Sequence, residues 1–321
     1  MRKINQAVVY LGIALLSACG GGGGGGTGNS SAALLTITPS NYEGIATDSM
    51  AGANGTADTS SLGVNLIGAQ ISQSGSVGLK KVVLSTANTV LKNWATFNQP
   101  SLTGAVIQET LSCTGGGTVS ASVDDADDSQ SLSSGDTANA RFINCSEDGM
   151  TINGSLTITV NSFSGNMFSS GSANLSMSFN NLNAGSDAID GSLNLVINQT
   201  NQSTSTVSLT MPNITFTTGG YSLTYNDMNL TASTNGSTTS LTMTGNVSSG
   251  RYGGSVDVST PAALTIDSSN RVTGNILMTG NNGTKVRIMG QGTTSILIEA
   301  DTTGNGTYNT NTLVTLASLG L

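Results

Sequence analysis

Residues 155–160 read Ser155-Leu156-Thr157-Ile158-Thr159-Val160, with an aliphatic residue at every second position and a hydroxyl residue at the others. Successive side chains of an extended strand point to opposite faces, so this order puts the aliphatic groups on one face and the hydroxyl groups on the other. The same alternation recurs in Leu175, Met177 and Phe179, in Leu193, Leu195 and Ile197, in Val207, Leu209 and Met211, and in Ile296 and Ile298. The pattern predicts antiparallel strands with one face in a core and one face in water.

Turn signals separate these strands. They are Asn153-Gly154, Asp190-Gly191, Gly219-Gly220, Asn235-Gly236, Asn282-Gly283 and Asn305-Gly306. Such pairs favour the left-handed backbone of tight hairpins. Because no helical pattern lies between the strands, strands that follow one another in the sequence are expected to pair. The sequence therefore predicts an all-β fold over residues 146–321, with large antiparallel sheets arranged as a sandwich, a roll or an open barrel.

One segment before these strands has a helical period. Its apolar residues are Leu79, Val82, Val83, Val90, Leu91 and Trp94. Their spacing predicts one short amphipathic helix over residues 78–97, inside a mixed N-terminal segment that covers residues 34–112. We expect the apolar stripe of this helix, which includes the only tryptophan of the chain, to pack against a sheet.

The composition excludes several classes of function. The 321 residues include 10 basic and 18 acidic side chains, and an acidic chain of this kind repels the phosphate backbone of nucleic acids. The chain has no histidine, so it lacks both the usual activator of a Ser or Cys nucleophile and the commonest ligand of transition metals. The glutamates are scattered, at Glu43, Glu109, Glu147 and Glu299. We therefore predict a protein that is not an enzyme and does not bind nucleic acid.

The N-terminus has the layout of an export signal. Arg2 and Lys3 precede a short apolar run over residues 7–16, and small residues then lead to Cys19. The stretch Leu16-Ser17-Ala18-Cys19 resembles the lipobox of bacterial lipoprotein precursors. The resemblance implies a signal peptide over residues 1–18 and lipid attachment to Cys19. By the same resemblance, a glycine after the cysteine implies the outer membrane.

A glycine run over residues 20–26 follows the lipobox. Glycine has maximal backbone freedom, so residues 19–33 are expected to form a lipidated, flexible tether. With its Ser/Thr/Asn-rich β-region, the chain resembles β-rich outer-membrane lipoproteins of Gram-negative bacteria. The resemblance implies a lipid anchor in the outer membrane, on its periplasmic face or at the cell surface. The resemblance implies no particular biochemical activity.

Two cysteines, Cys113 and Cys145, remain besides the lipobox cysteine. In an exported protein an even pair predicts a disulfide, whereas a zinc site would need two further ligands. The two cysteines lie at equal distances along the chain from Ser129. The flanking alternations are Val119, Ala121 and Val123 on one side, and Ala138, Ala140 and Phe142 on the other. We therefore expect residues 113–145 to form a hairpin that a disulfide closes at its base.

The tip of this hairpin resembles an EF-hand calcium loop. In a twelve-residue count from Asp125, that residue, Asp127 and Ser129 occupy the first, third and fifth positions. Ser131 would offer its backbone carbonyl at the seventh position, and Asp136 would close the coordination at the twelfth. The loop departs from the pattern, because glutamine replaces the usual glycine at the sixth position and aspartate the usual glutamate at the twelfth. The alternative is an acidic, solvated turn.

A weaker second metal loop is predicted near the C-terminus. Asp301, Thr303 and Asn305 place oxygen atoms at the first, third and fifth positions, but the twelfth position holds Thr312 where a carboxylate is needed. An Asn-Gly hairpin turn explains the same residues with fewer assumptions.

These features together predict a lipid-anchored β-protein of the cell envelope with a structural or adhesive role, with calcium as its cofactor. Its expected partners are the membrane, through the anchor, and a protein, glycan or lipid ligand. One alternative is a carrier that holds a lipid or another apolar ligand in a cavity between sheets. A further alternative is a carboxylate-based hydrolase, because two distant carboxylates can converge only in the fold.

Overall fold

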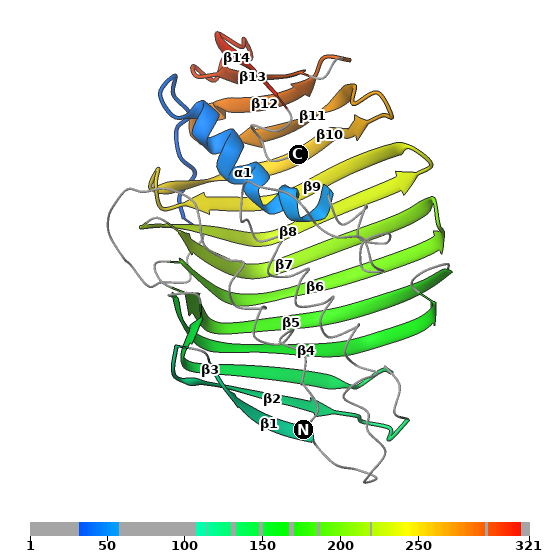
Figure 1. Ribbon diagram of the computed structural model, residues 1–321. Helices are drawn as coiled ribbons and strands as arrows, with labels where there is room; N and C mark the ends of the chain where they lie inside the picture. Colours follow the sequence, from blue (N-terminus) through cyan, green and yellow to red (C-terminus); the bar gives the residue numbers. More distant parts are fainter. Residues whose placement is uncertain are drawn as a thin grey trace.

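The computed structural model describes residues 32–57, 107–113, 115–129, 133–147, 150–166, 170–184, 187–218, 220–292 and 295–315 (Figure 1). The elements in these residues are α1 (Tyr42–Ala57), β1 (Ile107–Ser112), β2 (Thr118–Asp124), β3 (Thr137–Glu147), β4 (Met150–Asn166), β5 (Ser170–Ala184), β6 (Asp187–Asn201), β7 (Thr204–Thr218), β8 (Tyr221–Asn235), β9 (Thr238–Ser249), β10 (Gly254–Ile266), β11 (Val272–Thr279), η3 (Asn281–Gly283), β12 (Lys285–Gly290), β13 (Ser295–Asp301) and β14 (Thr310–Thr315). The helix predicted over residues 78–97 lies outside the described residues, and so do Cys19 and residues 20–31 of the predicted tether. The last two tether residues, Ala32 and Ala33, are described, and their carbonyl oxygens accept hydrogen bonds from Ser255 of β10.

The described strands form a single antiparallel meander. All fourteen belong to one sheet, in the order β1 to β14, and each strand pairs with the next one in the sequence. This confirms the predicted all-β antiparallel fold, as one sheet and not as the two layers of a sandwich. The sheet is continuous across residue 146, so the hairpin over residues 113–145 and the region after it share one sheet.

The two faces of the sheet have the chemistry that the alternation predicted. Aliphatic residues of successive strands, such as Leu156, Leu175 and Leu195, are buried on one face and belong to one hydrophobic core. Ser, Thr and Asn residues point to the other face, where they are half-buried or exposed. Burial of the aliphatic face removes apolar surface from water and is the main source of stability of such a sheet.

Two of the predicted turns lie inside strands. Asn153-Gly154 belongs to β4 and Asp190-Gly191 to β6, where they lie opposite bulges whose extra residue is on β3 or β5. In both, the residue before glycine accepts a hydrogen bond from an asparagine N–H of the preceding strand: Asn144 N to Asn153 Oδ1, 2.7 Å, and Asn181 N to Asp190 Oδ1, 2.9 Å. The prediction of hairpins at these two pairs was wrong, because the positive φ of Gly154 and Gly191 serves a strand that faces a bulge and not a tight turn.

These bulges continue across the sheet as a diagonal line, which we call the crease. It is made of residues with positive φ and their register shifts, at Asn144, Gly154, Asn181, Gly191, Asp227 and Gly245. A bulge bends its strand and increases the local twist. A line of bulges therefore bends neighbouring strands together, and β4 to β9 curve along their length (Figure 1).

The helix α1 lies across the apolar face, in contact with β7, β8, β9, β12 and β13 (Figure 1). Ile45, Ala46 and Met50 are buried in the core. Ser249 Oγ donates a hydrogen bond of 2.8 Å to Asp48 Oδ2, and Tyr225 Oη donates one of 2.9 Å to the Asp48 carbonyl oxygen. These contacts fix the helix on the sheet.

The chain before α1 is hydrogen-bonded to the first residues of β10. Leu34 forms a parallel bridge with Ser255 at the start of β10. The Leu35 N–H donates to the Ser255 carbonyl oxygen at 2.9 Å, and the Ser255 N–H donates to the Ala33 carbonyl oxygen at 3.0 Å. The first described residues therefore enter the fold beside the β9–β10 turn.

Candidate metal centre

The predicted hairpin is formed by β2 and β3. Its residues pair as Val119 with Phe142, Ala121 with Ala140 and Val123 with Ala138. These are the two alternating arms found in the sequence, and both present the same face to the core. The loop between the strands therefore projects from the end of the sheet.

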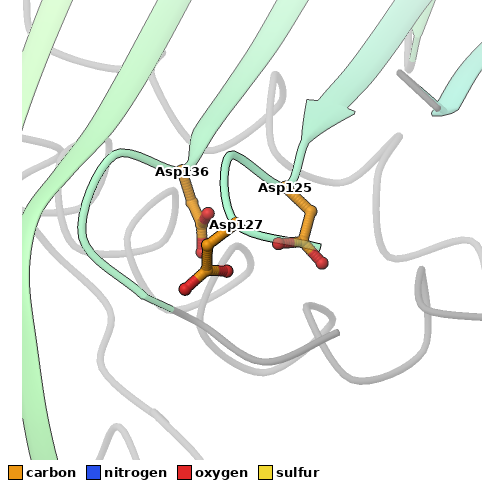
Figure 2. A group of neighbouring side chains, drawn as sticks. All are labelled: Asp125, Asp127 and Asp136. Carbon is orange, nitrogen blue, oxygen red and sulfur yellow. The ribbon is translucent and has the colours of Figure 1, made fainter. Parts of the chain in front are cut away.

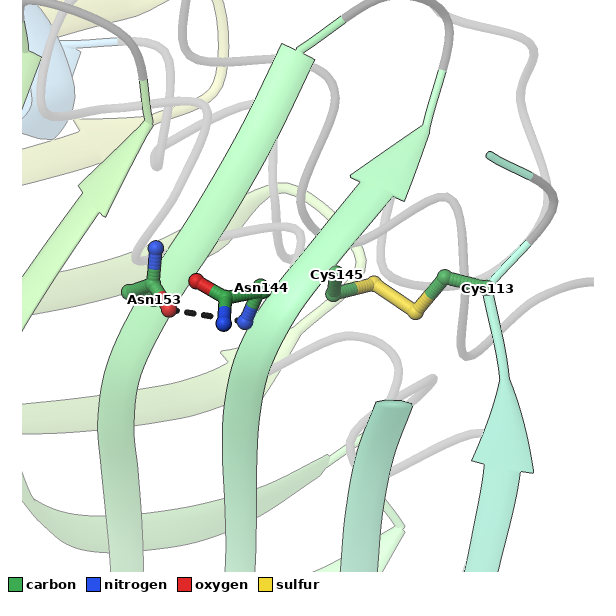
Figure 3. The surroundings of a disulfide bond; sticks show 4 residues. All are labelled: Cys113, Asn144, Cys145 and Asn153. Carbon is green, nitrogen blue, oxygen red and sulfur yellow. Dashed lines mark hydrogen bonds between the residues drawn. A yellow bond between two sulfur atoms is a disulfide. The ribbon is translucent and has the colours of Figure 1, made fainter. Parts of the chain in front are cut away.

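The predicted disulfide joins Cys113 and Cys145, whose Cα atoms are 5.3 Å apart (Figure 3). Cys113 begins the turn between β1 and β2, and Cys145 lies on β3. The same turn is bonded to β3 by its backbone, because the Gly115 N–H donates to the Ser146 carbonyl oxygen at 2.8 Å. The bridge thus ties the β1–β2 turn to β3, across the end of β2.

Three of the predicted ligands meet at the opposite end of this hairpin. Asp125 follows β2, Asp127 lies in the loop and Asp136 precedes β3 (Figure 2). One carboxylate oxygen of each residue lies within 4.8 Å of one oxygen of the other two. Three carboxylates at this separation can hold a metal ion. Oxygen ligands of this kind suit hard cations such as Ca²⁺, Mg²⁺ and Mn²⁺.

Asp136 has a second role, since it closes the loop. Its side chain is fully buried. The Ala126 N–H donates to Asp136 Oδ1 at 3.0 Å, and the Ser133 N–H donates to Asp136 Oδ2 at 2.5 Å. The Asp136 carbonyl oxygen also accepts a hydrogen bond of 2.9 Å from the N–H of Val160 on β4. One residue therefore joins both ends of the loop to the sheet.

Asp125 and Asp127 organise the first half of the loop. The Ser129 N–H donates to one oxygen of each carboxylate, at 3.1 Å in both cases. A hydrogen bond from the Ser129 side chain is the main cause that holds the pKa of Asp127 below its usual value. Desolvation opposes it, and further contacts with Ser133, the Ser129 backbone and Asp125 lower the pKa. Asp127 is therefore ionised at neutral pH, as a metal ligand must be.

The remaining predicted ligands of this loop are placed as follows. Ser129 lies in the loop, where its N–H binds the two carboxylates. Ser131 lies outside the described residues. Ser133 stands at the ninth position of the count from Asp125, and its Oγ is buried without a hydrogen bond of standard geometry. A buried hydroxyl oxygen in this state has an unused lone pair.

The second predicted metal loop is organised around its own backbone. The buried Asp301 carboxylate accepts hydrogen bonds from the N–H groups of Thr303, Gly304 and Gly306, at 3.2, 2.8 and 2.7 Å. Desolvation raises the pKa of Asp301, but these hydrogen bonds outweigh it and the pKa lies below its usual value. Both carboxylate oxygens are thus used by N–H donors, the arrangement of a turn closed on an aspartate. The Asn305 side chain likewise accepts from the Thr307 N–H at 2.8 Å.

The four glutamates lie on four different elements. Glu43 lies on α1, Glu109 on β1 and Glu147 on β3. Glu299 on β13 pairs with Arg287 on β12, whose guanidinium also lies 4.3 Å from the centre of the Tyr308 ring. Glu299 is therefore part of an ion pair whose guanidinium also makes a cation–π contact with Tyr308.

Comparison with protein-family models, curated proteins and solved structures found no match for this chain. Among the described residues, no helix is long and apolar enough to cross a membrane.

Proposed function

We propose that the protein is a structural or adhesive β-protein of the bacterial cell envelope, anchored by lipid on Cys19 and stabilised by calcium bound to Asp125, Asp127 and Asp136. The observation that carries the proposal is the meeting of three carboxylates at the tip of a hairpin whose other end carries a disulfide. A disulfide persists in an oxidising compartment, which supports export. The lipobox supports the anchor.

Calcium is the ion that this loop suits best. Three carboxylates held together repel one another, and a divalent cation relieves that repulsion. Calcium accepts six to eight oxygen ligands in irregular arrangements, whereas magnesium needs a near-ideal octahedron and gives up its water reluctantly. The three carboxylates come from an irregular loop, and the Ser133 hydroxyl has bonding capacity left. This mixture of ligands favours calcium.

The proposed role of the ion is to stabilise the hairpin. Asp125 and Asp136 lie at the two ends of the loop, so an ion between them holds the ends of β2 and β3 together. We therefore expect calcium to raise the melting temperature of the purified mature chain relative to chelator. At a calcium concentration about 100 times the dissociation constant, mass action stabilises the folded state by about 2.7 kcal/mol. Differential scanning calorimetry measures this effect.

The decisive variant is Asp125→Asn with Asp127→Asn. We expect it to melt at the same temperature in calcium and in chelator. The matched control is Asp128→Asn, which removes one negative charge from the same loop but leaves all three members of the group. This control should keep the calcium response. If the wild type melts no higher in calcium than in chelator, or if Asp128→Asn abolishes the response as well, the loop is an acidic turn.

A further inference from the structure

The outward face of β4 to β9 carries three rows of polar side chains that run across the strands, which we call the hydroxyl face. The register places Thr159, Ser176, Asn194, Thr210, Asn229 and Thr244 in the first row, Ser162, Asn174, Val196, Ser208, Thr231 and Thr242 in the second, and Ser164, Ser172, Asn198, Thr206, Ser233 and Ser240 in the third. All are half-buried or exposed. Seventeen of these eighteen side chains are hydroxyls or amides.

The hydroxyl face has no charge. Between Asp148 and Arg251 the sequence has three charged residues, Asp187, Asp190 and Asp227. None of them belongs to the three rows, and Asp190 and Asp227 lie at the crease. About a quarter of the residues of an average soluble domain are charged. A neutral face of this extent therefore needs an explanation beyond solubility.

The polar groups of this face are ordered by bonds to one another. Ser208 and Thr231 join through their hydroxyls at 3.2 Å, and Thr210 Oγ1 donates to Asn229 Oδ1 at 3.1 Å. In the neighbouring strands Asn161 Nδ2 donates to Ser176 Oγ at 2.7 Å. A hydroxyl has one donor and two acceptor positions, so each still has capacity for a partner. Groups already held in place lose little entropy when they bind.

We propose that the hydroxyl face binds a neutral polysaccharide. A polyanion such as nucleic acid or an acidic glycan would find no cation here, and a lipid surface would find one apolar side chain, Val196. A hydroxyl-rich neutral polymer matches both the lack of charge and the donor and acceptor groups. Strands about 4.8 Å apart and rows about 6.7 Å apart make a repeating array, which suits a repeating ligand. Without aromatic rings each contact is weak, and many contacts along the polymer supply the affinity.

This inference names the partner of the proposed adhesive role and rests on that role, but it does not depend on calcium. The test is co-sedimentation of the purified mature chain with three insoluble neutral polysaccharides: cellulose, chitin and cross-linked dextran. We expect the wild type to sediment with at least one of them, equally at low and high NaCl, because no ion pair takes part. The calcium-loop variant Asp125→Asn with Asp127→Asn should bind as well as the wild type, so the two proposals can fail separately.

The specific variant is Ser208→Lys with Thr242→Lys, which places two ammonium groups in the second row. We expect it to bind at least about tenfold more weakly, equivalent to about 1.4 kcal/mol. The matched control is Ser268→Lys with Ser269→Lys, which adds the same charge in the β10–β11 turn and should bind like the wild type. The second control, Ser208→Thr with Thr242→Ser, keeps both hydroxyls and should also bind. Melting temperatures show that each variant is folded.

Three outcomes would overturn the proposal. The first is no sedimentation with any of the three polysaccharides. The second is equal binding by the folded Ser208→Lys, Thr242→Lys variant, which would place the contact elsewhere. The third is self-association of the wild type, measured by analytical ultracentrifugation, that this variant abolishes. That result would show that the hydroxyl face joins two copies of the chain.

Discussion

Asp48 is a carboxylate that the fold takes almost entirely out of water, with 4% of its surface exposed. Desolvation raises its pKa, and the hydrogen bond from Ser249 and the charge of Arg251 lower it by less. The folded protein therefore binds the Asp48 proton more tightly than the unfolded chain does. Ionisation of Asp48 destabilises the fold progressively as the pH rises from the unfolded pKa, about 3.9, through the higher folded pKa.

We predict that Asp48→Asn removes this pH dependence. The free energy of unfolding of the variant should improve relative to that of the wild type as the pH rises from acid to neutral. Urea unfolding across this range measures the difference. The change Asp257→Asn, at an exposed residue of β10, gives the effect of losing one negative charge at the surface. A variant whose stability keeps a constant offset from the wild type at every pH would contradict the prediction.

At the scale of single residues the sequence predicted the group of three aspartates through spacing alone. Asp125, Asp127 and Asp136 are separated by the intervals of a calcium loop, and these intervals survive because the loop is short and its ends are held by paired strands. The second role of Asp136 was not predictable. It depends on the N–H groups of Ala126 and Ser133, and backbone donors are present at almost every residue of any sequence.

The crease predicts that replacing one of its glycines destabilises the protein more than replacing a glycine of a turn. A Cβ atom on Gly154 would lie 2.2 Å from the carbonyl oxygen of Asn181, and φ at Gly154 is +104°. Gly236, in the β8–β9 turn, also has a positive φ of +63°, but a Cβ atom there would meet nothing within 4 Å. We expect Gly236→Ala to cost about 1 kcal/mol from backbone strain. Gly154→Ala should cost about 3 kcal/mol or more, because strain and a clash with backbone add.

The midpoint of urea unfolding compares the two variants. Equal losses of unfolding free energy would mean that a small shift of β5 relieves the clash, and that the backbone of the crease can adjust. A larger loss for Gly154→Ala would show that the bulge is rigid and that its glycine is required.

At the scale of elements, strands were easier to predict than the helix. An aliphatic residue at every second position marks the side chains that will be buried on one face. Burial of that face is what stabilises a strand in a half-buried sheet. The helix α1 was missed because its sequence, YEGIATDSMAGANGTA, contains three glycines and no strong apolar period. Its position depends on distant partners. A Cβ atom on Gly44 would collide with the hydroxyl of Tyr252, so the glycine leaves room for this side chain of the β9–β10 turn beside the helix.

The pairs of Asn or Asp with Gly show a limit of local sequence. Asn235-Gly236 and Asn282-Gly283 do lie between strands, whereas Asn153-Gly154 and Asp190-Gly191 lie within them. The local backbone is left-handed in both settings. Only the strands on either side decide between a turn and a bulge, and that choice is made by long-range pairing.

At the scale of the whole molecule, the proposed lipid anchor predicts where the protein is found in the cell. We expect the wild type to fractionate with outer membranes, because the lipid proposed on Cys19 would hold it there, and several acyl chains hold a protein stably. The variant Cys19→Ser should appear in the soluble fraction of the same cells. The variant Cys113→Ser with Cys145→Ser is the control, since it also replaces cysteine by serine, here at the disulfide, but keeps the lipobox. If Cys19→Ser remains with the outer membrane, the anchor lies elsewhere.

A meander that reverses at every strand sorts its turns into two opposite rims. The chain enters beside the β9–β10 turn, on the rim that also holds the β1–β2 turn with its disulfide. The aspartate loop between β2 and β3 lies toward the other rim, and the seven residues of β2 separate it from the disulfide turn by about 23 Å. The tether proposed to follow Cys19 would therefore give the molecule a base and a top. The base would face the lipid. The top would expose the aspartates to the surrounding medium, whose concentration of divalent ions would decide whether an ion is bound.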